Sequence, residues 1–201
     1  MNSDITTVIF DCFGVLSPPV LHSWYKNNSI KSGFVDDKLF EVLEQFDLGK
    51  LSEDDIFKYF SGYKGVKATP EQIRKEVDSY LKLDSKLINL ILKLKDQGFK
   101  TVLLSNANAV FFEREVYAKY PGFKKLFDEI IISSNVGMIK PNKDIYLYTL
   151  NKINSKPEEC LLIDDSKNNL DGAVSLGING FLYTNLDLLV SYLKSIGINA
   201  Y

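Results

Sequence analysis

Five short apolar runs, rich in β-branched residues and separated by helical patterns, constrain the fold of this chain more than any other feature. They span residues 5–10, 101–104, 129–132, 160–163 and 180–183. Short runs of this kind that end at a polar residue are typical of buried strands. Strands that alternate with helices form parallel sheets with helices on both faces. We therefore predict an α/β fold built on a parallel sheet.

Three helical patterns lie between the later runs. Asp84 is a suitable N-cap for a helix that carries apolar residues on one face and that Gly98 would end. Pro141 suits the first position of a second helix. A third pattern follows Ser166 and stops at Gly177. We expect these helices to cover the predicted sheet.

Residues 16–83 break this alternation, because they contain helix signals and no convincing strand. Apolar residues recur there at helical spacing in three segments, two of which begin with Ser52 and Thr69 in capping-box patterns. The segment is too long for a simple connection between a strand and the next helix. We predict a small all-helical cap domain over residues 16–83, inserted after the first strand, and a core domain formed by residues 1–15 and 84–201.

Composition and charge exclude several classes of function. The formal net charge is −2, whereas proteins that bind nucleic acid usually carry a clear basic excess. The N-terminus lacks the features of a secretory signal, and no segment approaches the roughly 20 apolar residues that span a bilayer. The only two cysteines are Cys12 and Cys160, so we expect no disulfide scaffold and a cytoplasmic location. We expect a monomer or a weak homodimer.

Polar residues follow the predicted strands at the points where these end. They are Asp11, Ser105 with Asn106, Lys140, and the pair Asp164 and Asp165. Ligands of open parallel sheets bind beyond the carboxyl ends of the strands. Each residue alone has an ordinary explanation, because Asp, Ser and Asn are common in turns and caps. Together they place a nucleophile, polar donors, a cation and paired acids at one edge of the sheet.

Three carboxylates in one small space raise one another's pKa. A Mg²⁺ ion relieves this repulsion, because it takes carboxylates, water and a phosphate oxygen as ligands. A carboxylate held in this way can attack phosphorus and form an aspartyl-phosphate, which water then hydrolyses. The pattern therefore predicts a magnesium-dependent phosphomonoester hydrolase with Asp11 as the nucleophile.

Four segments resemble the four ordered motifs of the haloacid dehalogenase superfamily. They are Val-Ile-Phe-Asp11-Cys-Phe-Gly-Val-Leu16, Leu-Leu-Ser105-Asn106, Gly-Met-Ile-Lys140-Pro141 and Leu-Ile-Asp164-Asp165-Ser-Lys-Asn-Asn169. Within the superfamily the chain is most similar to capped enzymes of subfamily I that resemble bacterial α-glucose-1-phosphatases. The resemblance implies a Rossmann-like sheet with a helical cap and Mg²⁺ as cofactor. It also implies a small phosphorylated metabolite as substrate, with a sugar phosphate favoured.

The resemblance further implies a role for each motif residue. Asp11 and Lys140 would be the catalytic residues. The residues expected to bind the phosphoryl group are Ser105, Asn106 and Lys140. The expected metal ligands are Asp11, Asp164, Asp165 and the backbone carbonyl of Phe13. Asn169 would position a coordinated water.

Phe13 departs from the usual pattern of the superfamily. Most of its phosphatases carry an aspartate two residues after the nucleophile, where it serves as general acid and base, and this chain has Phe13 there. Loss of a general acid typically costs about 10²–10⁴ in rate. Some members similar to the α-glucose-1-phosphatases also lack this aspartate. We therefore expect activity, with a preference for good leaving groups such as anomeric sugar phosphates.

Two alternative functions stay open at this point. A metal-independent haloacid dehalogenase would use the same aspartate and agrees with Phe13, whereas Asp164 and Asp165 argue against it. A phosphate-binding module with low turnover would also explain Phe13. In the cap, His22 and Trp24 are candidates to face the substrate, although such clusters more often serve packing.

Overall fold

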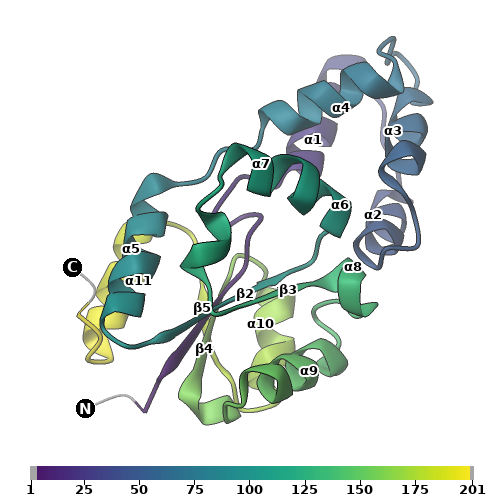
Figure 1. Ribbon diagram of the computed structural model, residues 1–201. Coiled ribbons are helices and arrows are strands. Elements are labelled where there is room, and N and C mark those ends of the chain that lie inside the picture. The colour runs from purple at the N-terminus through teal and green to yellow at the C-terminus, as the bar shows by residue number, and fades with distance from the viewer. Residues whose placement is uncertain (1–3, 200–201) are drawn as a thin grey trace.

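The computed structural model describes residues 4–199, in which five parallel strands form one sheet in the order β3-β2-β1-β4-β5 (Figure 1). The strands are β1 (Thr7–Phe10), β2 (Lys100–Ser105), β3 (Glu129–Ile132), β4 (Cys160–Asp164) and β5 (Asn179–Leu182). β1 lies at the centre, where Ile9 is in register with Val102 of β2 and Leu162 of β4. The predicted α/β fold and all five expected strands are confirmed, with ends that shift by at most two residues.

Alternate side chains of the strands face two separate hydrophobic cores. Val8, Phe10 and Leu103 belong to one buried cluster, whereas Ile9 and Val102 belong to the other. Successive side chains of a strand point to opposite faces of its sheet. The strands therefore appear as continuous apolar runs because both faces of the sheet are buried.

Four helices cover these two faces (Figure 1). α5 (Ser85–Asp96) and α11 (Leu186–Ser195) contribute to the first cluster, and α9 (Lys143–Ile153) and α10 (Lys167–Val174) contribute to the second. The short helix α8 (Ser133–Val136) follows β3, and a 3₁₀ turn (Pro157–Glu159) precedes β4. The helices thus form the two outer layers that the alternating pattern predicted.

The start of α9 differs from the prediction. Pro141 is not the first helical residue, because Asn142 is the N-cap and the helix begins at Lys143. The amide of Asn142 donates to the carbonyl oxygen of Ile139 at 3.0 Å, so the chain makes a turn before the helix starts. The predicted cap of α5 is confirmed, since the Asp84 carboxylate accepts from two backbone amides of the first turn.

Four helices form the insertion between β1 and α5. They are α1 (Val20–Ser32), α2 (Leu39–Asp47), α3 (Glu53–Ser61) and α4 (Pro70–Ser79). Figure 1 shows them as a lobe beyond the carboxyl ends of the strands. A helical insertion after the first strand is therefore confirmed. The domain limits at residues 16–83 stay a prediction, and residues 1–3 and 200–201 of the predicted core lie outside the described residues.

Sequence patterns predicted three of these helices, but α1 was not predicted. The side chains of Ser52 and Thr69 begin α3 and α4 in capping boxes, as predicted. In α1 only Val20 and Trp24 are buried. Its sequence therefore lacks the regular apolar stripe by which an amphipathic helix is recognised.

A second segment of helical turns follows β2. It consists of α6 (Ala109–Phe111), a π-helical turn (Phe112–Val116), α7 (Tyr117–Lys119) and a 3₁₀ turn (Phe123–Leu126). Figure 1 shows this segment between the sheet and the inserted helices. Arg114 in the π-helical turn pairs with Glu53 of α3 at 2.9 Å and with Asp78 of α4 at 2.7 Å. These ion pairs tie the insertion to the core.

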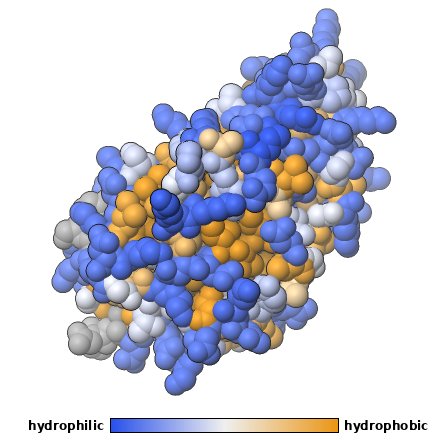
Figure 2. Space-filling view, in the orientation of Figure 1, coloured by the Kyte–Doolittle hydropathy of each residue, from blue (hydrophilic) through white to orange (hydrophobic). Residues whose placement is uncertain are grey.

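The surface is mostly polar. Figure 2 shows hydrophilic residues over most of the visible face, with hydrophobic residues gathered in a band across its middle. No helix of the described chain is long and apolar enough to cross a membrane. Cys12 and Cys160 are both buried and free.

Candidate active site

The predicted site residues meet at the carboxyl edge of the sheet. Phe10 lies in register with Leu103 of β2 and Ile163 of β4. Asp11, Ser105 and Asp164 therefore follow within two residues at the ends of three adjacent strands. The amide of Asp11 donates to the Ile163 carbonyl oxygen at 2.9 Å, which fixes the backbone of the predicted nucleophile.

Lys140 joins two of the carboxylates. Its Nζ lies 2.9 Å from Asp11 Oδ1 and 2.6 Å from Asp164 Oδ2, and its side chain is fully buried. The side chain of Asn106 holds the backbone of Lys140 in place, because it donates to the Lys140 carbonyl and accepts from the Lys140 amide, both at 2.9 Å. Asn106 thus positions Lys140, in addition to the phosphate-binding role that was predicted for it.

Three carboxylates converge beside this lysine. One oxygen each of Asp11, Asp164 and Asp165 lies within 4.8 Å of the others. Asn169 donates from Nδ2 to both oxygens of Asp164 at 3.0 and 3.2 Å, so it orients a predicted metal ligand. Among the described residues, this arrangement has the oxygen donors and spacing that suit a hard divalent cation.

Gly14 allows this convergence. Its φ is +104°, which L side chains rarely adopt, and a Cβ atom there would lie 2.1 Å from a carboxylate oxygen of Asp165. The Gly14 amide donates to the Ser17 carbonyl at 2.7 Å and closes the loop after Asp11. Phe13 lies in this loop, and its carbonyl as a metal ligand stays a prediction.

Burial and the charges of neighbouring groups shift the pKa values of these residues. Burial and the charge of Asp164 together raise the pKa of Asp11 to about 7, against the opposing effect of Lys140. Burial and the charge of Asp164 also raise the pKa of Asp165. Burial lowers the pKa of Lys140, but the adjacent carboxylates of Asp11 and Asp164 outweigh it and hold this pKa above its usual value. The lysine is therefore charged, and the acids have an excess of negative charge that a bound cation would neutralise.

The hydroxyl group of Ser105 is buried without a hydrogen-bond partner among the described residues. Its side chain is fully buried at the end of β2, and its Oγ has no hydrogen-bond partner in the described structure. Buried hydroxyl groups almost always find a partner in a protein or its ligand. The geometry therefore leaves the Ser105 hydroxyl available to a ligand, and its phosphate-binding role stays a prediction.

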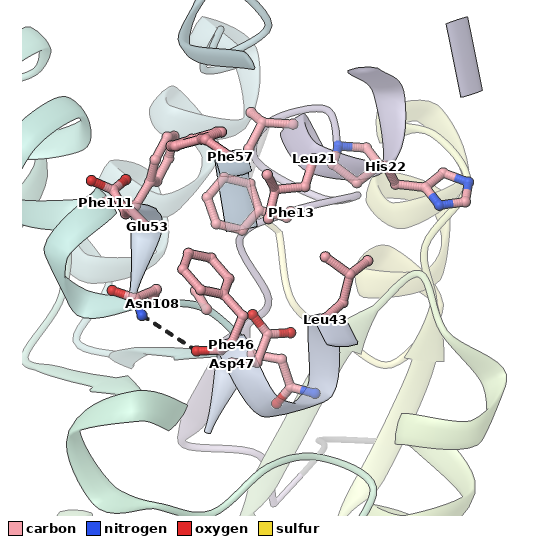
Figure 3. A pocket seen from close by; sticks show the side chains of 14 residues that line it. Phe13, Leu21, His22, Leu43, Phe46, Asp47, Glu53, Phe57, Asn108 and Phe111 are labelled. Carbon is pink, nitrogen blue, oxygen red and sulfur yellow. Dashed lines mark hydrogen bonds between the residues drawn. The ribbon is translucent and has the colours of Figure 1, made fainter. Parts of the chain in front are cut away.

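A cavity of about 150 Å³ lies next to this edge, between the core loops and the inserted helices (Figure 3). Core residues Phe13 and Asn106 line it together with Leu43 and Phe46 of α2. His22 also lines the cavity, as proposed for a cap residue that faces substrate. The cavity therefore lies directly beside Asn106, one of the residues predicted to bind the phosphoryl group.

Trp24 has a different position from the one proposed for it. Its ring stacks on Phe60 with centroids 4.9 Å apart, and its Nε1 donates to Glu76 at 2.7 Å. The side chain is only 1% exposed and is not part of the cavity wall. Trp24 therefore packs the inserted helices together.

Asp47 is a cavity residue that the sequence analysis missed. It ends α2, lines the cavity and is partly buried. Burial and, to a smaller extent, the charge of Asp11 raise its pKa to about 7. In the sequence, Asp47 stands just before Leu48 and Gly49 at the end of a predicted helix. Nothing in that pattern pointed toward the catalytic edge.

Comparisons with known proteins agree with this arrangement. Sesquiterpene phosphatase astK from Aspergillus oryzae is 28% identical over 148 residues, which cover 72% of this chain and 74% of that protein. A predicted HAD-like family hydrolase from Porphyromonas gingivalis has a similar structure, with a TM-score of 0.74, 25% identity, and coverage of 96% and 97% of the two chains.

A third comparison concerns the fold alone. A HAD family enzyme from Bacteroides thetaiotaomicron, solved with magnesium and inorganic phosphate, is 22% identical with a TM-score of 0.70 over 92% of this chain and 98% of that one. Several other curated relatives are longer proteins, of which the chain spans less than half. Residues 5–177 match the family described as haloacid dehalogenase-like hydrolase. The chain therefore belongs to the haloacid dehalogenase-like hydrolases.

Proposed function

We propose that this chain is a magnesium-dependent phosphomonoesterase in which Asp11 attacks the phosphorus atom of its substrate. The observation that carries the proposal is the pairing of Lys140 with Asp11 and Asp164 at 2.9 and 2.6 Å. A carboxylate Oδ of Asp11 forms a bond to phosphorus while the bond from phosphorus to the ester oxygen breaks. Water then attacks the aspartyl-phosphate, releases inorganic phosphate and regenerates Asp11.

The carboxylate cluster suits Mg²⁺ by its chemistry. Asp11, Asp164 and Asp165 supply oxygen ligands within 4.8 Å of one another, and the Phe13 carbonyl would be a further ligand. Bound Mg²⁺ supplies charge that stabilises the transferring phosphoryl oxygens. The absence of a side chain at Gly14 supports this site, because a Cβ atom there would displace the Asp165 carboxylate.

The phosphoryl group is held by this chain's own donors. The Ser105 hydroxyl, which has no partner in the described structure, donates to a phosphoryl oxygen. The Lys140 ammonium balances the charge that develops as Asp11 attacks. Donors that are already in place before the reaction stabilise such charge without any cost of reorganisation.

We further propose a small phosphorylated metabolite as the substrate. The motifs favour a sugar phosphate within this class, and the sesquiterpene phosphatase similarity supports a phosphomonoester. The buried free thiols of Cys12 and Cys160 support a cytoplasmic location. We keep a monomer or a weak homodimer as the proposed state of assembly.

Hydrolysis of p-nitrophenyl phosphate tests the proposed activity. We expect release of p-nitrophenol and phosphate that needs Mg²⁺ and that the isosteric variant Asp11→Asn abolishes. Asp171→Asn is a matched control, because this aspartate is exposed on α10 and its carboxylate pairs with the exposed Lys167. Halide release from haloacids without Mg²⁺ would instead favour a dehalogenase. Phosphate binding without hydrolysis would favour a low-turnover binding module.

A further inference from the structure

The cavity beside the catalytic edge has walls made mainly of hydrocarbon. Its apolar lining includes Phe13, Val20, Leu43, Phe46, Phe57 and Phe111. Its volume of about 150 Å³ equals that of an engineered apolar cavity in another protein that holds one benzene molecule. The space therefore matches a compact apolar group attached to the phosphate.

The polar residues of the wall are mostly engaged with the protein itself. Both carboxylate oxygens of Glu53 bind Arg114, at 2.9 and 3.0 Å. Asn108 caps α6 through the Val110 amide at 3.0 Å and donates to the Phe46 carbonyl at 3.3 Å. Figure 3 shows this last bond as a dashed line.

Two further polar residues offer little to a buried hydroxyl group. The Asn106 amide and carbonyl are both bonded to the backbone of Lys140. His22 is exposed, and in Figure 3 its ring points away from the other lining side chains. Each sugar hydroxyl placed here without a partner would carry a desolvation cost. Among the described lining residues, the Asp47 carboxylate and the second N–H of the Asn106 amide are left to pair with one.

We propose that the substrate is the phosphate monoester of a small apolar alcohol, of about five to seven carbon atoms by comparison with benzene. This inference rests on the proposed phosphatase activity and narrows its substrate class. The phosphoryl group lies against Asp11 and Lys140, and the hydrocarbon chain enters the cavity beside Phe13 and Leu43. The cavity lining therefore favours apolar esters, in place of the sugar phosphates that the motif resemblance alone suggests.

A series of n-alkyl phosphates from ethyl to hexyl tests this inference. Their leaving groups have nearly equal reactivity, so the series isolates the contribution of the cavity. We expect kcat/KM to rise about fourfold per methylene group. Glycerol 1-phosphate and propyl phosphate form a matched pair with the same carbon chain, and we expect propyl phosphate to be hydrolysed at least tenfold more efficiently.

Two variants on α2 localise the effect. Leu43→Gln places a polar group of similar size in the wall and should flatten the dependence on chain length. Phe40→Gln is the control, because Phe40 is 75% exposed on the same helix and should keep that dependence. Thermal unfolding of both variants shows whether they are folded. If Leu43→Gln does not fold, the wild-type series alone tests the inference.

The outcomes separate the inference from the activity on which it rests. A rise with chain length together with a preference for propyl phosphate supports an apolar substrate. Equal or better hydrolysis of glycerol 1-phosphate and hexose phosphates overturns it and leaves the phosphatase in place. Failure to hydrolyse any phosphomonoester, including p-nitrophenyl phosphate, overturns the proposed function itself.

Asp47 carries a second inference from a different observation. Its carboxylate lines the cavity, and Figure 3 shows it there beside Phe46. The end of α2 is fixed against the core, since Ser133 Oγ donates to the Asp47 carbonyl at 2.6 Å. The carboxylate itself has no hydrogen bond to a described residue.

We propose that Asp47 is the proton donor to the leaving alcohol and replaces the acid that is missing at Phe13. As Asp11 forms its bond to phosphorus, the Asp47 carboxyl gives its proton to the ester oxygen that departs. The resulting Asp47 carboxylate then accepts a proton from the water that attacks the aspartyl-phosphate. Protons and charges therefore balance over one turnover.

The surroundings of Asp47 allow it to hold this proton near neutral pH. Burial and the charge of Asp11, opposed by Lys140, together raise its pKa to about 7. The other charged groups that line the cavity are Glu53, which is neutralised by Arg114, and exposed His22. A general acid works best when its pKa is close to the working pH.

Two substrates with different leaving groups test the role of Asp47. In Asp47→Asn, kcat for hexyl phosphate should fall about 10²–10⁴-fold. With p-nitrophenyl phosphate, whose leaving group departs without a proton, the initial burst of p-nitrophenol should keep a rate within about tenfold of wild type. The alkaline decline in kcat for hexyl phosphate should disappear in this variant.

Glu44→Gln is the control for this variant, because Glu44 lies exposed on the same helix. It should leave both rates and the pH profile unchanged. An equal fall in the p-nitrophenol burst and in hexyl phosphate turnover would assign Asp47 a structural role and overturn the inference. Unchanged turnover of hexyl phosphate in Asp47→Asn would also overturn it.

Discussion

At the scale of single residues, the buried ammonium group of Lys140 sets the charge of the site. Its side chain is fully buried between Asp11 and Asp164. Removing one partner of a buried ion pair leaves an uncompensated charge, at a cost of about 3–5 kcal/mol. We expect Lys140→Gln to lower the free energy of unfolding by this amount in urea titrations without Mg²⁺. The exposed Lys167→Gln should change it little, and equal stability of the two variants would contradict this account.

Replacing Asp47 is expected to stabilise the protein, whereas replacing Lys140 is expected to destabilise it. Its pKa is about 7 in the folded protein and about 3.9 in an unfolded chain. Its contribution to stability is therefore fully present below about pH 4 and is lost as the pH rises through 7. We expect Asp47→Asn to gain melting temperature relative to wild type between pH 4 and pH 8. A constant difference between the two proteins across this range would show that the carboxyl is not perturbed.

Three of the motif residues were predictable at this scale because each ends or directly follows a strand, whereas Lys140 lies in the loop after α8. Asp11, Asp164 and Ser105 follow apolar runs that sequence patterns identify well. The positions of Asp47 and Trp24 were not predictable, because their surroundings depend on how the inserted helices pack. The direction in which a helical side chain points relative to a distant loop is set by tertiary contacts, which leave no local pattern.

At the scale of secondary structure elements, the π-helical turn after β2 connects the core to the insertion. Arg114 in this turn binds Glu53 of α3 and Asp78 of α4. We expect Arg114→Gln to cost about 1–3 kcal/mol of stability, because it leaves the buried Glu53 without its partner. Glu53 also lines the cavity, so KM for hexyl phosphate should rise. Chemical denaturation and steady-state kinetics measure the two effects.

The control for this variant is an ion pair that ties nothing to the core. Lys75 pairs with Glu71 at 3.0 Å on one exposed face of α4. Lys75→Gln should cost less than about 1 kcal/mol and leave KM unchanged. Equal losses in Arg114→Gln and Lys75→Gln would contradict the role of Arg114 as a connection between the π-helical turn and the inserted helices.

The elements themselves were predictable to different degrees. Apolar runs predict the strands, and capping boxes predict the starts of helices, as at Ser52 and Thr69. No such pattern predicts α1 or the π-helical turn. α1 buries only two residues, and the turn depends on contacts with α3 and α4. Local pattern therefore defines the core sheet better than the segments that shape the cavity.

At the scale of the whole molecule, the core supplies the carboxylate cluster, and the core and the insertion share the cavity wall. Asp11, Asp164 and Asp165 belong to the sheet edge. A ligand that binds only the folded protein stabilises it by RT ln(1 + [L]/Kd), about 2.7 kcal/mol at 100 times Kd. We expect Mg²⁺ to raise the melting temperature of the wild type and Asp165→Asn to lose this shift. Asp171→Asn should keep it, and an equal shift in all three proteins would place the ion elsewhere.

The central claim is that Asp11 becomes phosphorylated during turnover. The most direct measurement is to mix the enzyme with p-nitrophenyl phosphate and Mg²⁺, quench it in acid and reduce it with borohydride. This treatment converts an aspartyl-phosphate into homoserine, which peptide mass spectrometry locates in the sequence. We predict homoserine at position 11, dependent on substrate and Mg²⁺. Phosphate release with Asp11 unmodified, or with the label at another residue, would contradict the mechanism.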